Sequence, residues 1–121
     1  MDLVLTEEQT LLQQTVRGFV AGRSSLKRIR ALRDGGDRDG FSRPLWTEMA
    51  RLGWVGITIP VEHGGVGLGA LDLMVVMEEL GRGLMPEPMA GTVLLGTPAL
   101  LLGGSPAQQA AHLPAVASGG R

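Results

Sequence analysis

The chain has 121 residues, and its 11 Lys and Arg against 12 Asp and Glu give a formal charge of −1. Recognition of nucleic acid or of an anionic membrane needs a clear basic excess, so neither partner is expected. Hydrophobic residues make up 44%, which excludes a disordered polar chain, and the length suits one domain. Because cysteine is absent, disulfides, thiolate metal sites and thiol nucleophiles are excluded.

No export signal or membrane span is predicted. The start Met1-Asp2-Leu3 lacks the basic segment and apolar run of a secretory signal. The most apolar stretch, 84–102, contains Glu87 and is interrupted by prolines and glycines, whereas a span needs about 20 mainly apolar residues in one helix. We therefore expect a cytoplasmic protein.

The first predicted helix begins after Thr6. Thr6 is a good N-cap, and Gln9 three residues later completes a capping-box pattern. An apolar face follows at helical spacing: Leu12, Val16, Phe19 and Val20. Gly22 is expected to end this helix.

The next segment, 23–39, is dense in charge. We interpret it as a solvated surface segment with a flexible turn at 34–37. The alternative is that its basic residues bind an anion such as the phosphates of a nucleotide tail. Acidic residues are interleaved, however, and no aromatic ring is present to stack on a base.

A second helix is predicted to start at Ser42, a suitable N-cap, with Pro44 in the first turn where its missing N–H costs nothing. Gly53 supplies the left-handed position at its end. A short extended piece at 54–60 and a glycine-dense loop at 62–69 are expected to follow.

Three more helices are predicted in the second half. The helix at 70–82 is apolar on most sides, which is typical of burial between layers; Glu78 can pair with Arg82, and Gly83 is expected to end it. Further helices are expected at 89–102 and from Ser105-Pro106 onward. Since no alternating strand pattern is present, we predict an all-α helical bundle domain of about five helices with a Gly-rich loop.

The glycine loop fits the dinucleotide-binding pattern G-x-G-x-x-G/A at Gly65 to Ala70. A dinucleotide site is nevertheless the minor alternative, because 60–63 separates the extended piece from the glycines. No second parallel strand or ribose-binding acid follows either. A structural loop is the favoured interpretation.

Other candidate chemistry is weak. Glu78 and Glu79 are adjacent on a helix and point about 100° apart, so they are interpreted as the polar edge of a mostly buried helix. His63 and His112 lie far apart and have no further ligand at metal-binding spacing. No catalytic, cofactor-binding or metal-binding residue is predicted.

The last quarter of the chain is unusual because 88–120 contains no Asp, Glu, Lys or Arg. A helix pair on the surface of a lone domain should carry a charged outer stripe. The absence of that stripe predicts that both faces are covered, by a partner domain, a partner subunit or an apolar ligand.

Five segments resemble the N-terminal helical domain of the acyl-CoA dehydrogenase family. The first three are Leu3-x-Leu5-Thr6-Glu7-Glu8-Gln9, Leu45-Trp46-x-x-Met49-Ala50-x-Leu52-Gly53-Trp54-x-Gly56 and Ile59-Pro60-x-Glu62-x-Gly64-Gly65-x-Gly67-Leu68-Gly69. The other two are Val76-Met77-Glu78-Glu79-Leu80-Gly81-Arg82 and Gly104-Ser105-x-x-Gln108-x-x-x-x-Leu113-Pro114-x-x-Ala117-Ser118-Gly119.

The resemblance implies a part of an FAD-dependent enzyme that oxidises the Cα–Cβ bond of an acyl-CoA thioester and passes electrons to an electron-transfer flavoprotein. It implies that 1–121 is the N-terminal α-helical domain, and that the middle β-domain, the C-terminal bundle and the catalytic glutamate lie outside it. An oligomer is expected, and the chain alone is expected to hold no FAD and to be inactive.

The resemblance also implies that the helix at 89–102 forms part of the acyl-pocket wall. By position the substrate-binding candidates are Gly91, Thr92, Leu95 and Gly96. The alternative is that these residues only pack against other protein. A second hypothesis for the whole chain is a non-catalytic helical interaction module that docks on a full-length relative.

Overall fold

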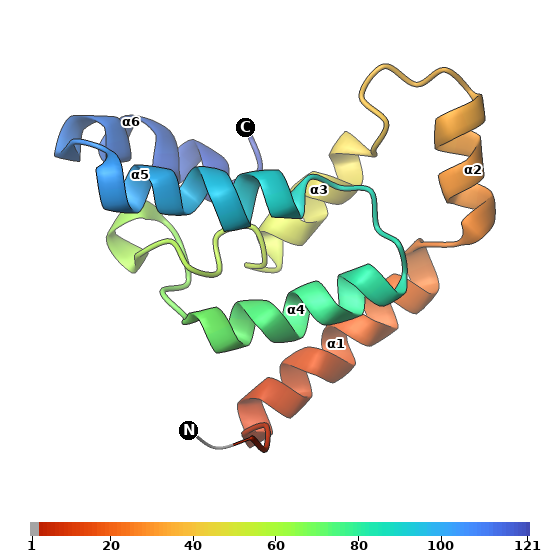
Figure 1. Cartoon of the computed structure of the whole chain (residues 1–121), viewed down its shortest axis with the longest axis horizontal. Coiled ribbons are helices and arrows are strands. Elements are labelled where there is room, and N and C mark those ends of the chain that lie inside the picture. Colours follow the sequence, from red (N-terminus) through yellow and green to blue (C-terminus); the bar gives the residue numbers. More distant parts are fainter. Residues whose placement is uncertain (1–2) are drawn as a thin grey trace. The chain divides into compact units, whose positions relative to one another are not determined.

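The computed structural model describes residues 3–121, which form helices joined by turns, with no strand among them (Figure 1). The helices are α1 (Glu7–Arg23), α2 (Leu26–Asp34), α3 (Arg43–Arg51), the 3-10 helix η1 (Val61–His63), α4 (Ala70–Arg82), the π-helix η2 (Ala90–Gly96), α5 (Thr97–Gly103) and α6 (Pro106–Ala117). The predicted all-α class is confirmed. The chain divides into two compact units, 3–41 with 74–86 and 42–73 with 87–121.

In the first unit, α1 lies beside the 74–82 part of α4 (Figure 1). The predicted capping box is present, because Thr6 Oγ1 accepts from the Gln9 N–H at 3.1 Å and Gln9 Oε1 accepts from the Thr6 N–H at 3.1 Å. Val16 and Val20 are buried as predicted, but α1 continues past Gly22 and ends at Arg23.

The end of α4 packs closely on α1. A Cβ on Gly83 would lie 2.0 Å from Val20 Cγ1, so a larger residue there would force the Val20 side chain to move. Ser24 Oγ donates to the Gly83 carbonyl at 3.1 Å. The left-handed residue that closes α4 is Leu84, with φ 51, and the Met85 N–H bonds to the Leu80 carbonyl at 3.1 Å in a Schellman-type cap.

The charge-dense segment contains a helix that the sequence pattern did not indicate. Ser25 caps α2 by accepting from the Arg28 N–H at 3.1 Å. No residue of α2 is buried, which confirms the prediction of a surface segment. The segment has too short a run of apolar residues at helical spacing, and too many arginines, for the pattern alone to predict a helix.

In the second unit, α3 begins and ends as predicted from its turn chemistry. Ser42 Oγ accepts from the Leu45 N–H at 3.3 Å, and Gly53 is left-handed with φ 87. The core is built around Trp46, Met49 and Trp54, each at most 2% exposed.

The segment 54–60 is not extended as predicted; it winds through tight turns. The Ile59 N–H bonds to the Gly56 carbonyl at 3.1 Å, which a strand could not do. The turns let the successive residues Trp54 and Val55 both become buried, whereas a strand would place successive side chains on opposite faces. A run of apolar residues is ambiguous between these two outcomes.

The last two helices run beside each other (Figure 1). A capping box at Ser105 and Gln108 starts α6, and Gln109 Nε2 donates to the Gly104 carbonyl at 3.2 Å. Leu113 of α6 joins Ile59 in a buried cluster. The predicted start of a helix at Ser105-Pro106 is therefore confirmed.

Gly65 is predicted to be essential for the second unit. A Cβ there would lie 2.0 Å from the Ile59 carbonyl oxygen. Gly65→Ala should lower the free energy of unfolding of the chain by about 1–3 kcal/mol, because backbone must move. Urea unfolding measures this.

Gly18→Ala is the matched control. Nothing lies within 4 Å of a Cβ at this position of α1. It should raise stability by about 1 kcal/mol through helix propensity. Equal stability changes for the two variants would contradict the close approach at Gly65.

Candidate functional site

The predicted helix at 89–102 forms two elements, the π-helix η2 and then α5. Met89, Val93 and Thr97 are buried at every fourth position of this helix, which belongs to the second unit. The register changes at Thr97, whose N–H donates to the Thr92 carbonyl five residues earlier. The prediction of a helix is confirmed, but its first half is wider than an α-helix.

The four predicted acyl-wall residues all lie on η2. Gly91, Leu95 and Gly96 are exposed, Leu95 to 70%, and Thr92 is half-buried. A Cβ on Gly91 would meet nothing within 4 Å. This part of η2 thus exposes small residues and one leucine. Its role as an acyl-pocket wall stays a prediction.

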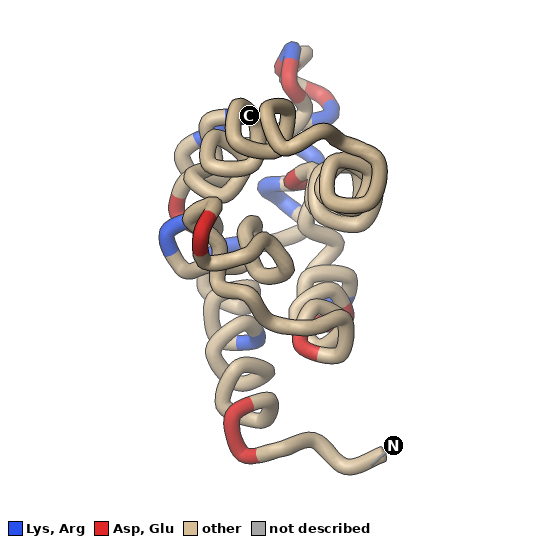
Figure 2. Tube along the Cα trace, turned by 90° about the vertical axis from the view of Figure 1, so that its left-hand side faces the viewer, with Lys and Arg blue, Asp and Glu red and all other residues tan. Residues whose placement is uncertain are grey.

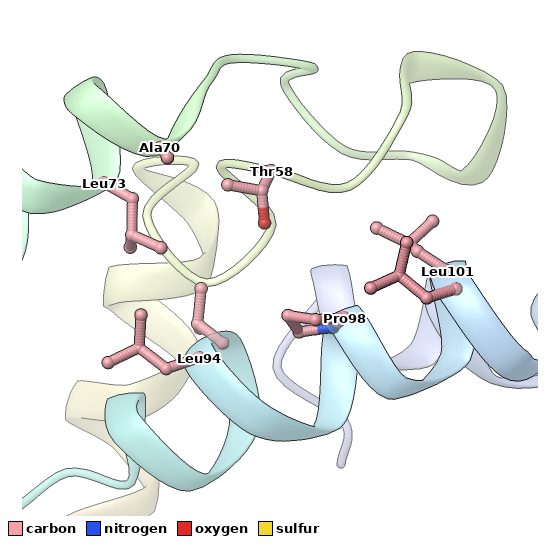
Figure 3. A pocket seen from close by; sticks show the side chains of 8 residues that line it. Thr58, Ala70, Leu73, Leu94, Pro98 and Leu101 are labelled. Carbon is pink, nitrogen blue, oxygen red and sulfur yellow. The ribbon is translucent and has the colours of Figure 1, made fainter.

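A pocket of about 320 Å³ opens on another side of the same helix (Figure 3). Thr58 and Leu73 face Leu94 and Pro98 across it (Figure 3). Its full lining is Thr58, Ala70, Leu73, Val93, Leu94, Pro98, Leu101 and Leu102. None of the four predicted wall residues contributes.

The sequence did carry a signal for this pocket. Leu94, Pro98 and Leu101 follow the i, i+4, i+7 spacing of one helix face. That spacing alone does not predict a pocket, because the opposite wall comes from Thr58 and Leu73, which only the tertiary fold brings to this helix.

The backbone N–H groups of 65–69 in the glycine loop are all bonded within the chain. A pyrophosphate site needs several backbone N–H groups that point at the ligand. Here the N–H groups of 65–68 bond to the chain itself: Gly65 to Pro60 (3.1 Å), Val66 to Gly56 (3.0 Å), Gly67 to Ile59 (2.9 Å) and Leu68 to Ile57 (2.8 Å). The Gly69 N–H bonds to Asp72 Oδ2 at 3.2 Å. These hydrogen bonds support the interpretation as a structural loop.

A buried ion pair joins α1 to α4 in the first unit. Arg17 binds Glu79 through two hydrogen bonds, Nε to Oε2 at 3.1 Å and Nη2 to Oε1 at 2.7 Å. Glu79 is 2% exposed and Arg17 55%, so the pair reaches solvent on the arginine side. Arg82 Nε lies 3.7 Å from Glu79 Oε1.

The ion pair corrects the prediction that Glu79 belongs to a polar edge. Glu79 follows Val75 by one helical turn, and the structure buries Val75, so Glu79 lies on the buried side of α4. Glu78 does lie on the exposed edge, where it accepts from Arg82 Nη2 at 3.1 Å as predicted.

The same contacts shift the ionisation of both partners. The hydrogen bonds from Arg17 hold the pKa of the Glu79 carboxyl below its ordinary value; burial opposes this, and the charges of Arg17 and Arg82 support it. The Arg17 pKa is raised, first by the hydrogen bonds to Glu79 and then by its charge. This site therefore holds a fixed carboxylate and suits a structural role rather than proton transfer.

Two further kinds of site are absent from residues 3–121. No group of three or more His, Cys, Asp and Glu side chains there could hold a metal ion. None of the described helices combines the length and apolar character needed to cross a bilayer.

The segment from η2 through α6 carries no charged residue (Figure 2). Leu95 is 70% exposed and Leu102 is 90% exposed on this segment. Such side chains on a stretch without charge are typical of a surface that another protein segment or a ligand covers.

The family is established by comparison with known proteins. A family model described as acyl-CoA dehydrogenase, N-terminal domain, matches residues 6–120. The chain therefore belongs to the acyl-CoA dehydrogenase family, and its helical fold is that of the family's N-terminal domain.

Relatives and a solved structure agree. Acyl-CoA dehydrogenase IpdE2 of Mycobacterium tuberculosis is 37% identical over 105 residues, which are 86% of this chain and 32% of the relative. Mitochondrial isovaleryl-CoA dehydrogenase of Pongo abelii is 35% identical over 117 residues, 95% of this chain and 27% of the relative. The variant steroid ACAD Tcur3481-Tcur3483 has a TM-score of 0.82 at 33% identity and is matched over 95% of this chain and 31% of its own. The chain thus spans about a third of its relatives' length.

Glu79→Gln should make stability less dependent on pH. Folding lowers the Glu79 pKa, so the pair stabilises the fold above the unfolded value of about 4.3 and loses this effect as pH falls through the folded value. At pH 7 the variant should lose about 1–3 kcal/mol of unfolding free energy, and the deficit should shrink toward pH 3. Chemical unfolding at a series of pH values measures it.

Glu78→Gln serves as the control, because Glu78 is exposed and pairs only at the surface. Its effect should stay within about 0.5 kcal/mol. A deficit for Glu79→Gln that does not change with pH would refute the ion-pair explanation.

Thr97→Val should stabilise the chain. Thr97 is 1% exposed, and its Oγ1 has no hydrogen-bond partner in the described structure. Removing this buried hydroxyl should raise the unfolding free energy by about 1 kcal/mol. In the control Thr47→Val, the lost hydroxyl donates to the Arg43 carbonyl at 3.1 Å, so stability should not increase. A stability loss for Thr97→Val would show that its hydroxyl is satisfied.

Proposed function

We propose that the chain is the N-terminal helical part of an FAD-dependent acyl-CoA dehydrogenase. The observation that carries the proposal is the family match over residues 6–120. The reaction is oxidation of the Cα–Cβ bond of an acyl-CoA thioester, with FAD as the acceptor of the hydride. The remaining domains of the enzyme supply the catalytic base and most of the FAD contacts, so this part alone is inactive and colourless.

The chain's own contribution is a surface rather than a reactive group. Support comes from η2, where Gly91, Thr92, Leu95 and Gly96 form a small, uncharged surface with Leu95 70% exposed. We assign this surface to the wall of the acyl pocket. The rest of the uncharged segment, including the exposed Leu102, packs against other domains or a partner subunit.

The family also suggests partners. We propose that the enzyme forms an oligomer and passes its electrons to an electron-transfer flavoprotein. The balanced charge of the chain, 11 basic against 12 acidic residues, offers no footprint for nucleic acid.

A second candidate function is a non-catalytic module that docks on a full-length relative. The exposed leucines of the uncharged segment favour it, because they present an apolar surface to any protein partner. The two functions differ in whether the protein, as its host makes it, carries flavin.

The test compares the protein purified from its host with the 121-residue chain alone. The host protein should show a flavin absorbance band that acyl-CoA bleaches, and the chain alone should show none. A host protein without flavin that binds a full-length relative would support the docking module instead. Flavin retained by the chain alone after gel filtration would overturn the claim that it is inactive by itself.

Gly91→Val tests the acyl wall in the flavin-containing protein. The new side chain enters open space, so the fold should tolerate it. It should lower kcat/KM for long acyl-CoA substrates about tenfold or more relative to short ones, since it occupies room for the chain. The control Gly103→Val also enters open space but lies outside the proposed wall, at the end of α5. The same change in the ratio for both variants would remove Gly91 from the pocket.

A further inference from the structure

The helix that carries the proposed acyl wall changes register just before a proline. We propose that Pro98 is a positioning residue for substrate specificity: it holds η2 in the π register and so selects which side chains form the wall. This inference rests on the proposed function, because it explains the shape of the surface that we assign to the acyl-pocket wall.

The register is visible in the backbone. The Thr97 N–H donates to the Thr92 carbonyl, five residues earlier, whereas an α-helix would use the Val93 carbonyl. A Cβ on Gly96 would lie 3.4 Å from the Gly91 carbonyl oxygen, so these two glycines stand one turn apart. The π-helix extends over Ala90–Gly96 and stops where α5 begins at Thr97.

Proline explains why the wide turn occurs here. Pro98 has no N–H, and in an α-helix its ring would collide with the Leu94 carbonyl four residues earlier. A wider turn carries that carbonyl away from the ring. Pro106 has no such effect, because it lies in the first turn of α6 where no N–H is needed.

The register decides the composition of the wall. In an α-helical register, each residue before Thr97 would take the place that the preceding residue holds now, which is a rotation of about 100°. Thr92 would take the place of Gly91, and Val93, now 0% exposed, would take that of Thr92. The π register therefore keeps a glycine in the wall and a valine in the core.

This arrangement has a local cost. Threonine in an α-helix can bond its hydroxyl to the carbonyl four residues earlier, but Thr97 Oγ1 is buried without a partner. In the register that Pro98 imposes, the Thr97 hydroxyl is therefore buried without a hydrogen bond. Wide turns of this kind recur at functional sites, which agrees with the proposed wall.

Cysteine labelling tests the register without any assay of activity. The chain has no cysteine, so Val93→Cys introduces a single thiol. It should react slowly with maleimide when Pro98 is present and several-fold faster in Pro98→Ala, as position 93 leaves the core. With Pro106→Ala the thiol should stay protected. Equal protection of the thiol with Pro98 and with Pro98→Ala would overturn the proposal.

Leu113→Cys separates a register change from general opening, because Leu113 is 0% exposed on α6. It should stay protected in Pro98→Ala. If it reacts, the measurement is repeated in the Gly18→Ala, Pro98→Ala chain, which should be more stable through the helix propensity of α1, away from the register change. Reaction at 93 no faster than at 113 in that chain would overturn the proposal.

Specificity is then measured in the flavin-containing protein. Pro98→Ala should change the ratio of kcat/KM values for long and short acyl-CoA substrates by about tenfold, whereas Pro106→Ala should not. A changed register with an unchanged ratio would overturn the specificity role. Absence of acyl-CoA oxidation by the parent protein would overturn the proposed function and that role together, while the labelling would still decide the register.

Discussion

The approach of Gly65 to the Ile59 carbonyl is the constraint on which the second unit depends. It brings the glycine loop against the turns of 54–60, and the loop's N–H groups are then satisfied by carbonyls of the chain. Ile59 is thereby held in the cluster that receives Leu113 of α6. A side chain at position 65 would separate these segments, so the same glycines that look like a nucleotide loop are needed for packing.

The helix of η2 and α5 contacts this cluster through Leu100 and Leu101 of α5. Met89, Val93 and Thr97 are buried as well, and the remaining sides of the helix carry different surfaces. One side forms the pocket with Thr58, and η2 also presents Gly91 and the exposed Leu95. A helix without charged residues can be buried on one side and still present small and apolar groups for contact on its other sides.

The first unit is held by a different kind of interaction. Glu79 is buried and fixed as a carboxylate by two hydrogen bonds from Arg17. A buried charge left without its partner is costly, so this contact favours one packing of α1 on α4 over others. Close contact of Gly83 with Val20 adds a steric requirement at the end of the same interface.

Local signals made most helix starts predictable from the sequence. Thr6 with Gln9, Ser42 with Pro44, and Ser105 each cap a helix by contacts within three residues, so no distant part of the chain is involved. The lack of charge in 88–120 is likewise a property of composition, and it was enough to predict a covered surface.

Other features depended on contacts between distant residues. The turns at 54–60, the burial of Glu79 and the pocket between Thr58 and Leu94 join residues that only the fold brings together. The π register involves both levels, because Pro98 can be read from the sequence, whereas the burial of Val93 beside the wide turn is an outcome of the fold.

The sequence by itself therefore determined a helical chain with an uncharged final segment, because capping, periodicity and charge are local properties. Only the tertiary structure decided which acidic residues are buried and which face of the last helices is left exposed. Those outcomes follow from packing between segments, and the free energy of packing depends on the partner surface as much as on the residue itself.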